Sequence, residues 1–180
     1  MAAESTFWKN NLQGSVQLLD GTGTPVTLTL STDRGDLKLT NLSSKLNAPV
    51  IQQRRGKFGS LNRGERLFVG VSLSCWVGNI VGSSNTAPGT PFEFVNRLGA
   101  YSANVSTLGA SREYTFDLKY TIEGTNFGDA ADETVTVEDV VATCEWQEAV
   151  DGTYFTLTGQ GLGAVVHGNS TNTPTMAQYS

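Results

Sequence analysis

The side chains that most often do chemistry in proteins are scarce in this chain of 180 residues. His167 is the sole histidine, and it lies in a polar C-terminal stretch. A Ser-His-Asp or Cys-His arrangement would have to use this one imidazole. One histidine and two well-separated cysteines also cannot assemble a metal site. We therefore expect no catalytic residue, no metal and no cofactor, and we expect that the protein is not an enzyme.

The two cysteines, Cys75 and Cys144, each lie in an apolar alternating run. We expect both to be small buried hydrophobic residues; a disulfide between neighbouring strands is the alternative. Two cysteines do not make a disulfide-rich secreted scaffold. The N-terminus shows no basic stretch followed by an apolar one, and no run of about 18 apolar residues occurs. These features predict a cytosolic pool of protein, no signal peptide and no membrane insertion.

Two further segments resemble ligand-binding loops. Residues 159–163 (GQGLG) suggest a phosphate-binding turn, but a helix must follow such a turn, and the next residues have strand character. The acidic residues of 129–133 lack the spacing of a calcium loop. We expect a glycine bend near a strand end in the first segment and a solvated turn in the second.

The composition favours β structure. The chain has 20 glycines, and charged residues make up 16% of it, below the usual share of about 25%. Because β-branched residues occur throughout and 38% of the residues are hydrophobic, a β core is expected and disorder is not.

Charge is divided unevenly along the chain. Residues 1–70 hold nine basic and five acidic residues, a net charge of +4, whereas residues 71–180 hold three basic and twelve acidic residues, a net charge of −9. The division either arises by chance or reflects a basic surface of one copy meeting an acidic surface of the next.

Alternating hydrophobic residues predict the strands. Asp20-Gly21 lies between two alternating runs and predicts a hairpin turn. In the run 133–148 the alternation changes phase at Glu138-Asp139, which predicts a bulge or a bend. The expected strands are residues 12–19, 25–30, 67–77, 114–123, 133–148, 153–158 and 164–166.

One helix is expected, over residues 91–98. Thr90 is a suitable N-cap, Pro91 the first helical residue, and Gly99 the stop. Its apolar residues Phe92, Val95 and Leu98 predict one stripe against a sheet. The fold class is therefore mainly β, an antiparallel β-sandwich or barrel with one flanking α-helix.

Residues 31–66 are irregular and basic, with short strands possible at 35–40 and 50–54. We expect an extended arm or a long hairpin that reaches off the domain and serves in binding. Its charges are interleaved with Gly, Asn and Ser, and Phe58 is its sole aromatic residue, so a nucleic-acid stacking platform is not indicated. The expected organisation is an N-terminal arm (1–11), a β domain (12–166, with the long loop 40–66) and a C-terminal arm (167–180).

The order of several segments resembles the tail tube (major tail) proteins of long-tailed bacteriophages, over most of residues 10–166. The segments are 20–25 (DGTGTP) with its alternating strand, 55–57 (RGK), 63–65 (RGE) before the strand 67–77, 114–122, 124–128 (GTNFG) and 133–139. Both ends of the chain depart from the resemblance.

The resemblance implies a subunit that forms hexameric rings, which stack into a hollow tube for genome delivery. The protein would then belong to the virion tail, assemble in the host cytoplasm and contact tape-measure and tail-terminator proteins, while double-stranded DNA passes without sequence-specific binding. The loop 40–66 and both arms would contact the next ring. The residues expected at these contacts are Phe7, Trp8, Arg54, Arg55, Lys57 and Arg63.

Four strands from each of six subunits would give a barrel of about 24 strands and a backbone diameter of roughly 48 Å, wide enough for one duplex. An acidic lumen would let DNA slide. We expect Asp117, Thr121, Glu123, Glu138 and Glu145 to face the lumen, with Lys119 paired to a neighbouring carboxylate.

Two other readings of the sequence stay open. Another structural virion protein (a tail terminator, baseplate or decoration protein) could share this composition without forming open-ended tubes. An Ig-like binding module would use loop tips such as residues 78–89 and would be monomeric.

Overall fold

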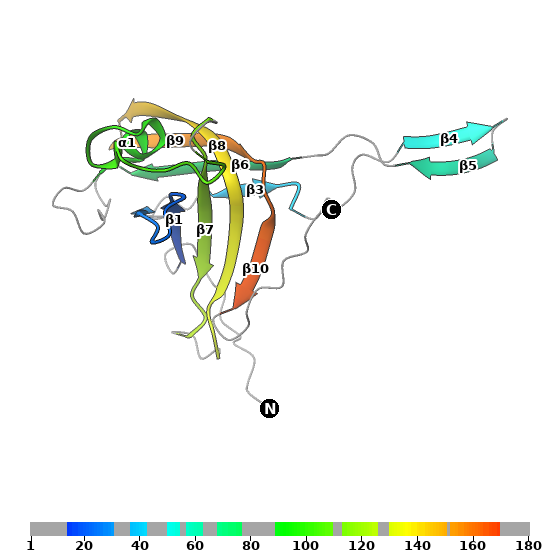
Figure 1. Ribbon diagram of the computed structural model, residues 1–180, viewed down its shortest axis with the longest axis horizontal. Helices are drawn as coiled ribbons and strands as arrows, with labels where there is room; N and C mark the ends of the chain where they lie inside the picture. Colours follow the sequence, from blue (N-terminus) through cyan, green and yellow to red (C-terminus); the bar gives the residue numbers. More distant parts are fainter. Residues whose placement is uncertain are drawn as a thin grey trace.

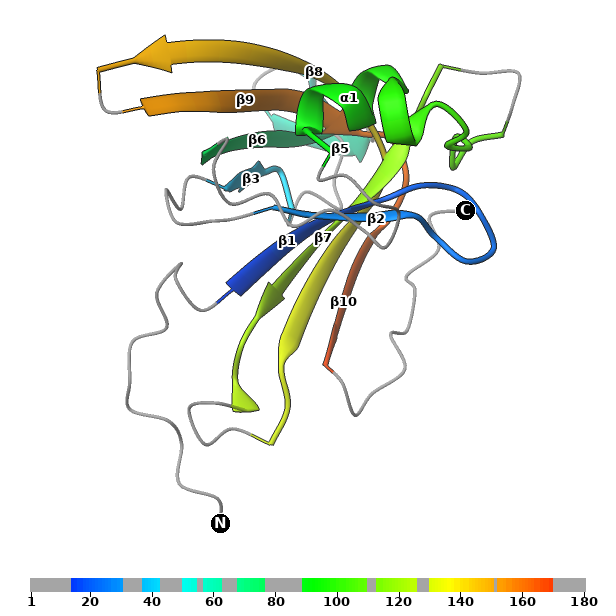
Figure 2. The ribbon, with the colours of Figure 1, turned by 90° about the vertical axis from the view of Figure 1, so that its left-hand side faces the viewer.

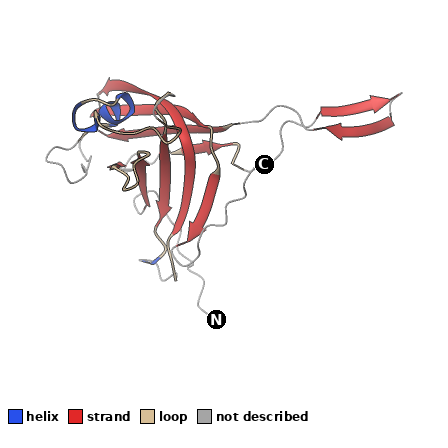
Figure 3. Ribbon diagram, viewed as in Figure 1, coloured by secondary structure: helices blue, strands red, loops and turns tan. Residues whose placement is uncertain are grey.

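The computed structural model describes residues 14–30, 37–42, 50–54, 57–62, 68–76, 89–109, 113–125, 130–150 and 152–169. These residues form an antiparallel sheet of eight strands, a separate two-stranded hairpin and one short α-helix (Figures 1 and 3). The predicted fold class, mainly β with a single flanking helix, is confirmed.

All neighbouring strands of the large sheet are antiparallel. Their order is β2-β1-β7-β8-β9-β6-β3, and β10 also pairs with β8. The strands are β1 (Gly14–Leu19), β2 (Thr27–Leu30), β3 (Lys38–Thr40), β6 (Val69–Trp76), β7 (Phe116–Ile122), β8 (Glu133–Ala149), β9 (Gly152–Gly161) and β10 (Val165–Asn169).

The long strand β8 divides the sheet into two layers. Residues 133–140 of β8 pair with β7, and residues 133–137 also pair with β10, whereas residues 140–149 pair with β9. We call β3, β6, β9 and residues 140–149 of β8 the upper layer, and β2, β1, β7, residues 133–140 of β8 and β10 the lower layer. Figures 1 and 2 show that the strands of the upper layer run across those of the lower layer and that β8 belongs to both.

The bend in β8 is a β-bulge at Glu138 and Asp139. Phe116 pairs with Val140 while Leu118 pairs with Val137, so β8 carries one residue more than β7 at this point. The facing strand is interrupted too, between β9 and β10. There the Gly163 N–H donates to the Glu138 carbonyl (3.0 Å) and the Glu138 N–H donates to the Ala164 carbonyl (2.9 Å). Facing interruptions let both strands turn together, which confirms the predicted bend.

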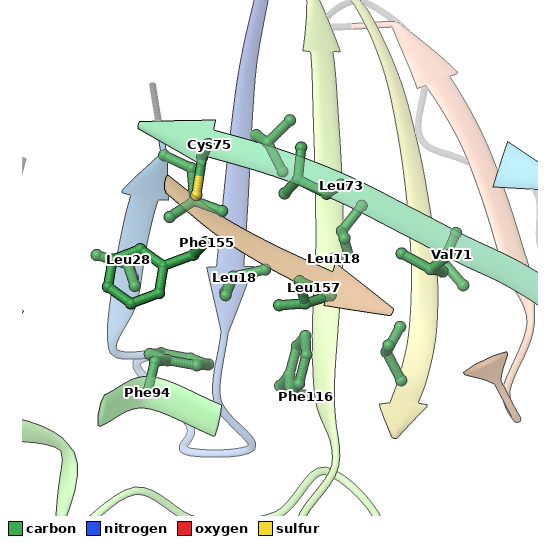
Figure 4. Close-up of a cluster of buried hydrophobic side chains, with 14 of the residues drawn as sticks. Leu18, Leu28, Val71, Leu73, Cys75, Phe94, Phe116, Leu118, Phe155 and Leu157 are labelled. Carbon is green, nitrogen blue, oxygen red and sulfur yellow. The ribbon is translucent and has the colours of Figure 1, made fainter. Parts of the chain in front are cut away.

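The hydrophobic core lies between the two layers (Figure 4). The lower layer contributes side chains such as Leu18, Leu28 and Leu118, and the upper layer contributes Leu73 and Phe155; each of these is completely buried. Side chains alternate between the two faces of a strand. In each layer, every second residue points into the core, and the residues between them point to the outer surface.

The helix α1 (Pro91–Asn96) begins as predicted but packs differently. Thr90 caps it in a capping box with Glu93, and Pro91 opens it. The predicted stripe is right for Val95, which packs against the core, and wrong for Phe92 (38% exposed) and Leu98 (46% exposed), while Phe94 is completely buried. Leu98 departs because the helix ends early, at Arg97, which adopts a left-handed conformation with φ 54°. Leu98 is therefore outside the helix, and Phe94 packs edge-to-face on Phe116, with ring centroids 5.7 Å apart.

The strand predictions hold with shifted ends. The hairpin β1–β2 turns at Asp20-Gly21, and β6 buries the predicted alternate residues Val69, Val71, Leu73 and Cys75. The last strand, β10, runs to Asn169, three residues beyond the expected end at 166. His167 is consequently a strand residue opposite Val135, not part of a tail.

The basic segment contains the hairpin β4 (Val50–Arg54) and β5 (Lys57–Asn62). Figure 1 shows this hairpin standing away from the large sheet, at the end of the molecule opposite the tip of β8. The expectation of a long hairpin that reaches off the domain is confirmed for these residues.

Candidate assembly surfaces

The two cysteines are free thiols in the core-facing register of the upper layer. Cys75 lies on β6 and Cys144 on β8, with β9 between them, so the alternative of a disulfide is not realised. Burial raises the pKa of Cys75 to about 11 and that of Cys144 to about 12. Both thiols are therefore protonated at neutral pH, which makes them poor nucleophiles.

Across the described ranges, no group of three or more His, Cys, Asp or Glu side chains could hold a metal ion. No helix among these residues has the length and apolar character that crossing a bilayer requires.

A buried carboxylate joins the β1–β2 turn to the loop that precedes β7. Asp20 is 2% exposed. One of its oxygens accepts from the Thr22 hydroxyl (2.8 Å) and the Val26 N–H (2.7 Å), and the other accepts from the Val105 N–H (3.1 Å). The sequence predicted the turn but not the hydrogen bond between Asp20 and Val105, because Val105 is 85 residues away in the chain.

The upper layer is open along β8. Beyond Val140, residues 141–149 pair with β9 on one side, and no described strand pairs with the other side. The neighbouring strand β7 cannot continue there, because the carbonyl of Thr115 accepts from the Thr107 N–H (3.1 Å) and the chain turns away. Figure 2 shows β8 as the outermost strand of this layer. The opposite edge of the same layer is β3.

These two edges run in opposite directions. The upper layer has four strands, β8, β9, β6 and β3, each antiparallel to the next. With an even number of antiparallel strands, the first and last strands are antiparallel. A copy placed beside another by rotation therefore brings β3 against β8 in an antiparallel sense, which is the ordinary pairing of such a sheet.

The edges of the lower layer do not have this property. Its five strands are β2, β1, β7, β8 and β10, so its edge strands β2 and β10 run in the same direction. Side-by-side copies joined through the lower layer would mix parallel and antiparallel pairs. If copies formed a closed ring, pairing through the upper layer would therefore be the more regular arrangement.

The surface face of the upper layer is rich in hydroxyl groups. In the register of β6, β9 and β8, Ser72 is aligned with Thr158 and Thr143, and Ser74 is aligned with Thr156 and Glu145. These residues alternate with the buried core residues and therefore point away from the core. We call this surface the hydroxyl face. The charged residues among its described positions are Glu145 and, on β3 beside Ser72, Lys38.

The residues expected in a lumen do not lie together. Asp117 and Thr121, with Lys119 between them, alternate with buried residues of β7 and so belong to the surface face of the lower layer; Glu123 follows that strand. Glu138 lies in the bulge. Of the five, Glu145 alone lies on the hydroxyl face of the upper layer.

Asp117 has a structural partner at the bulge. Its carboxylate accepts from the Asp139 N–H (3.0 Å), and Asp139 has the left-handed φ of 54° that the bulge requires. Burial, opposed by this hydrogen bond and reinforced by the negative charges of Glu138 and Asp139, raises the pKa of Asp117 to about 6. Asp117 therefore fastens β7 to the bend of β8.

The tip of β8 combines apolar and acidic groups. Trp146 is 61% exposed although its ring contacts Phe155 edge-to-face, and Val150 is fully exposed. Glu145 and Glu148, on the same stretch, are also exposed. A tryptophan this exposed is uncommon on a solitary domain and is typical of a contact surface.

Of the residues expected to contact a neighbouring ring, the structure describes the chain at Arg54 and Lys57. They are the last residue of β4 and the first of β5, at the turn of the hairpin. Phe7, Trp8, Arg55 and Arg63 lie outside the described residues, as do residues 78–88 of the segment 78–89 that a binding module would use.

Comparison of the chain with protein-family models, with curated proteins and with solved structures finds no match.

Proposed function

We propose that this protein is the wall subunit of a tail tube of a long-tailed bacteriophage, a structural rather than an enzymatic role. Copies join edge to edge into hexameric rings, and the rings stack into a channel through which double-stranded DNA passes. The protein then resides in the virion tail after assembly in the host cytoplasm, with tape-measure and tail-terminator proteins as further partners.

The observation that carries the proposal is the pair of open, opposed edges of the upper layer. Residues 141–149 of β8 and the three residues of β3 lie at its two edges, and their directions are compatible with antiparallel pairing between copies. An exposed edge is an aggregation hazard in a monomer, and ring closure removes it. Four strands from each of six copies make a barrel of about 24 strands.

The same arrangement selects the channel surface. The core side of the upper layer is covered by the lower layer and by Phe94 of α1, so it cannot face an open lumen. The hydroxyl face is therefore the face of the upper layer that can line the channel. DNA would pass over Ser72, Ser74, Thr143, Thr156, Thr158 and Glu145. A nearly neutral face suits transit because it offers phosphates no cluster of cations to bind.

This assignment changes the expected lumen. Glu145 is retained, whereas Asp117 and Thr121 belong to the lower layer, on the other side of the core. The proposed lumen is therefore the nearly neutral hydroxyl face, which lacks clustered cations at its described positions, and not an acidic surface.

Light scattering coupled to size exclusion, followed by negative-stain microscopy, tests the proposal on the purified chain. We expect particles of six subunit masses and, at higher concentration, hollow tubes of constant diameter. A protein that is monomeric at every concentration would contradict the proposal and favour a binding module. Closed rings that never stack would favour a tail terminator.

A further inference from the structure

We infer that the acidic tip of β8, carrying Trp146, is the seat for the basic β4–β5 hairpin of another copy. The inference rests on the proposed function, because it names the two surfaces by which one ring meets the next. Its partner is a second copy of this same chain.

The first support is charge. Residues 43–67, which contain the hairpin, hold six basic residues and one acidic residue, a net charge of +5. Residues 143–154, which contain the tip of β8 and the start of β9, hold three acidic residues and no basic one, a net charge of −3. Opposite charges of this size favour encounter and orientation of the two surfaces. They also explain why the charge of the chain is divided between its two parts.

The second support is position. Figure 1 shows the hairpin at one end of the long axis and the tip of β8 at the other end. In the chain order the hairpin lies between β3 and β6, whereas Trp146 is opposite Phe155, near the start of β9. A surface at one end and its complement at the other give a head-to-tail contact, which repeats without limit when copies are stacked.

The third support is the exposed apolar surface at the seat. Trp146 is 61% exposed beside the fully exposed Val150, and tryptophan is enriched among residues that dominate the energy of interfaces. A guanidinium group from the hairpin turn has a favourable partner in the face of an indole ring. The exposed carboxylate of Glu148 lies on the same face of β8 as this ring, whereas Glu145 points to the hydroxyl face.

Charge reversal tests the contact. The variant Glu148→Lys should still form rings, because the β8 edge pairs through backbone N–H and C=O groups that the variant keeps, but the mean tube length should fall about tenfold. The matched control is Glu133→Lys, which makes the same change in charge at an exposed position of β8 away from the tip. The control should form tubes of normal length.

The decisive experiment restores the contact by exchanging its charges. Lys57→Glu alone should also shorten the tubes, and combining it with Glu148→Lys should restore their length, because the charges are exchanged. Tubes of normal length from the Glu148→Lys variant, an equal loss in the control, or no restoration in the combined variant would each overturn the inference. If the unsubstituted protein forms neither rings nor tubes, it is the proposed function that fails.

Fluorescence gives an independent readout of the seat. Emission of the variant Trp8→Phe, which lacks the other tryptophan expected at a ring contact, should shift to shorter wavelength when rings stack, because Trp146 leaves water. The variant Trp8→Phe/Trp146→Phe should lose most of this shift. A full shift in the double variant would place the change at Trp76 and contradict the assigned seat.

Discussion

At the scale of single residues, two carboxylates hold the fold together rather than perform chemistry. Asp20 closes the β1–β2 turn and binds the Val105 N–H, and Asp117 binds the Asp139 N–H at the bend of β8. Both bonds join segments far apart in the chain, and both carboxylates accept from backbone N–H groups that would otherwise be left without a partner.

Replacing Asp20 with alanine should therefore be costly. At least two backbone N–H groups, those of Val26 and Val105, lose a buried acceptor, and we expect a loss of about 3 kcal/mol in the free energy of unfolding. The comparison variant is Asp132→Ala. Its carboxylate also accepts from two backbone N–H groups, those of Gly124 and Thr125, but at a less buried site, so we expect less than about 1 kcal/mol. Urea unfolding measures both, and equal losses would refute the role given to burial.

Asp117 makes a prediction about pH. Because its folded pKa of about 6 lies above the ordinary value of 3.8, the folded protein binds more protons than the unfolded chain between these values. Stability from this group is therefore present at low pH and is lost as the pH rises through about 6. Partial exposure reduces the effect, and we expect a loss of about 1 kcal/mol.

The variant Asp117→Asn keeps a carbonyl acceptor for the Asp139 N–H and has no charge to bury. It should be more stable than the unsubstituted protein at pH 7, by about 1 kcal/mol, and should lack the part of the pH dependence that Asp117 contributes in this window. Thermal unfolding between pH 4 and pH 7 measures the difference. A less stable variant at pH 7 would mean that the charged hydrogen bond outweighs the cost of burial.

At the scale of elements, β8 determines the architecture, because it belongs to both layers and bends between them. The close packing of β9 on β8 depends on glycine at position 159, where an added Cβ would meet the Val141 carbonyl and the Ala142 side chain. The backbone of β8 cannot move aside as a flexible side chain could. A side chain at position 159 would therefore force strand β9 away from β8.

We expect Gly159→Ala to lower the free energy of unfolding by about 2 kcal/mol. Gly23→Ala is the matched control, since an added Cβ there has no atom within 4 Å, and its effect should stay below about 0.5 kcal/mol. Chemical denaturation of the two variants provides the measurement. Similar values for both would show that the contact between β8 and β9 is looser than described.

Sequence patterns predicted the elements well where the signal is local. The alternation in β6 and β7, the phase change at Glu138-Asp139 and the Thr90 cap all depend on neighbours within a few residues, and the structure confirms each. Leu98 was wrongly included in the buried stripe of α1, because the left-handed turn at Arg97 ends the helix before it.

The candidate surfaces were harder to predict. Glu145 and Asp117 both alternate with apolar residues, and the sequence does not reveal that they belong to different layers of one bent sheet. The open edge of β8 is equally hidden, since it exists because β7 stops opposite Val140. Both facts depend on pairing between distant segments.

At the scale of the whole molecule, two features bear on assembly. The open edges of β8 and β3 are complementary in direction, and the sequence around the β4–β5 hairpin is basic whereas residues 143–154 are acidic. In the assembly that we propose, the edges would join copies side by side and the oppositely charged segments would join them head to tail. These are the lateral and axial contacts that the proposed tube needs.

The pairing of β3 with β8 between copies is the central claim, and cross-linking tests it most directly. The variant Thr40→Cys/Thr143→Cys places a thiol on the surface face of each edge strand, and a short flexible bis-maleimide should link copies into a covalent ladder that ends at six. Thr40→Cys/Thr121→Cys moves the second thiol to the lower layer and should give no ladder, while the unsubstituted protein supplies the background from Cys75 and Cys144. A ladder from the first variant that is absent from the other two is the predicted result; covalent monomers throughout, or ladders of equal yield from both variants, would contradict the account.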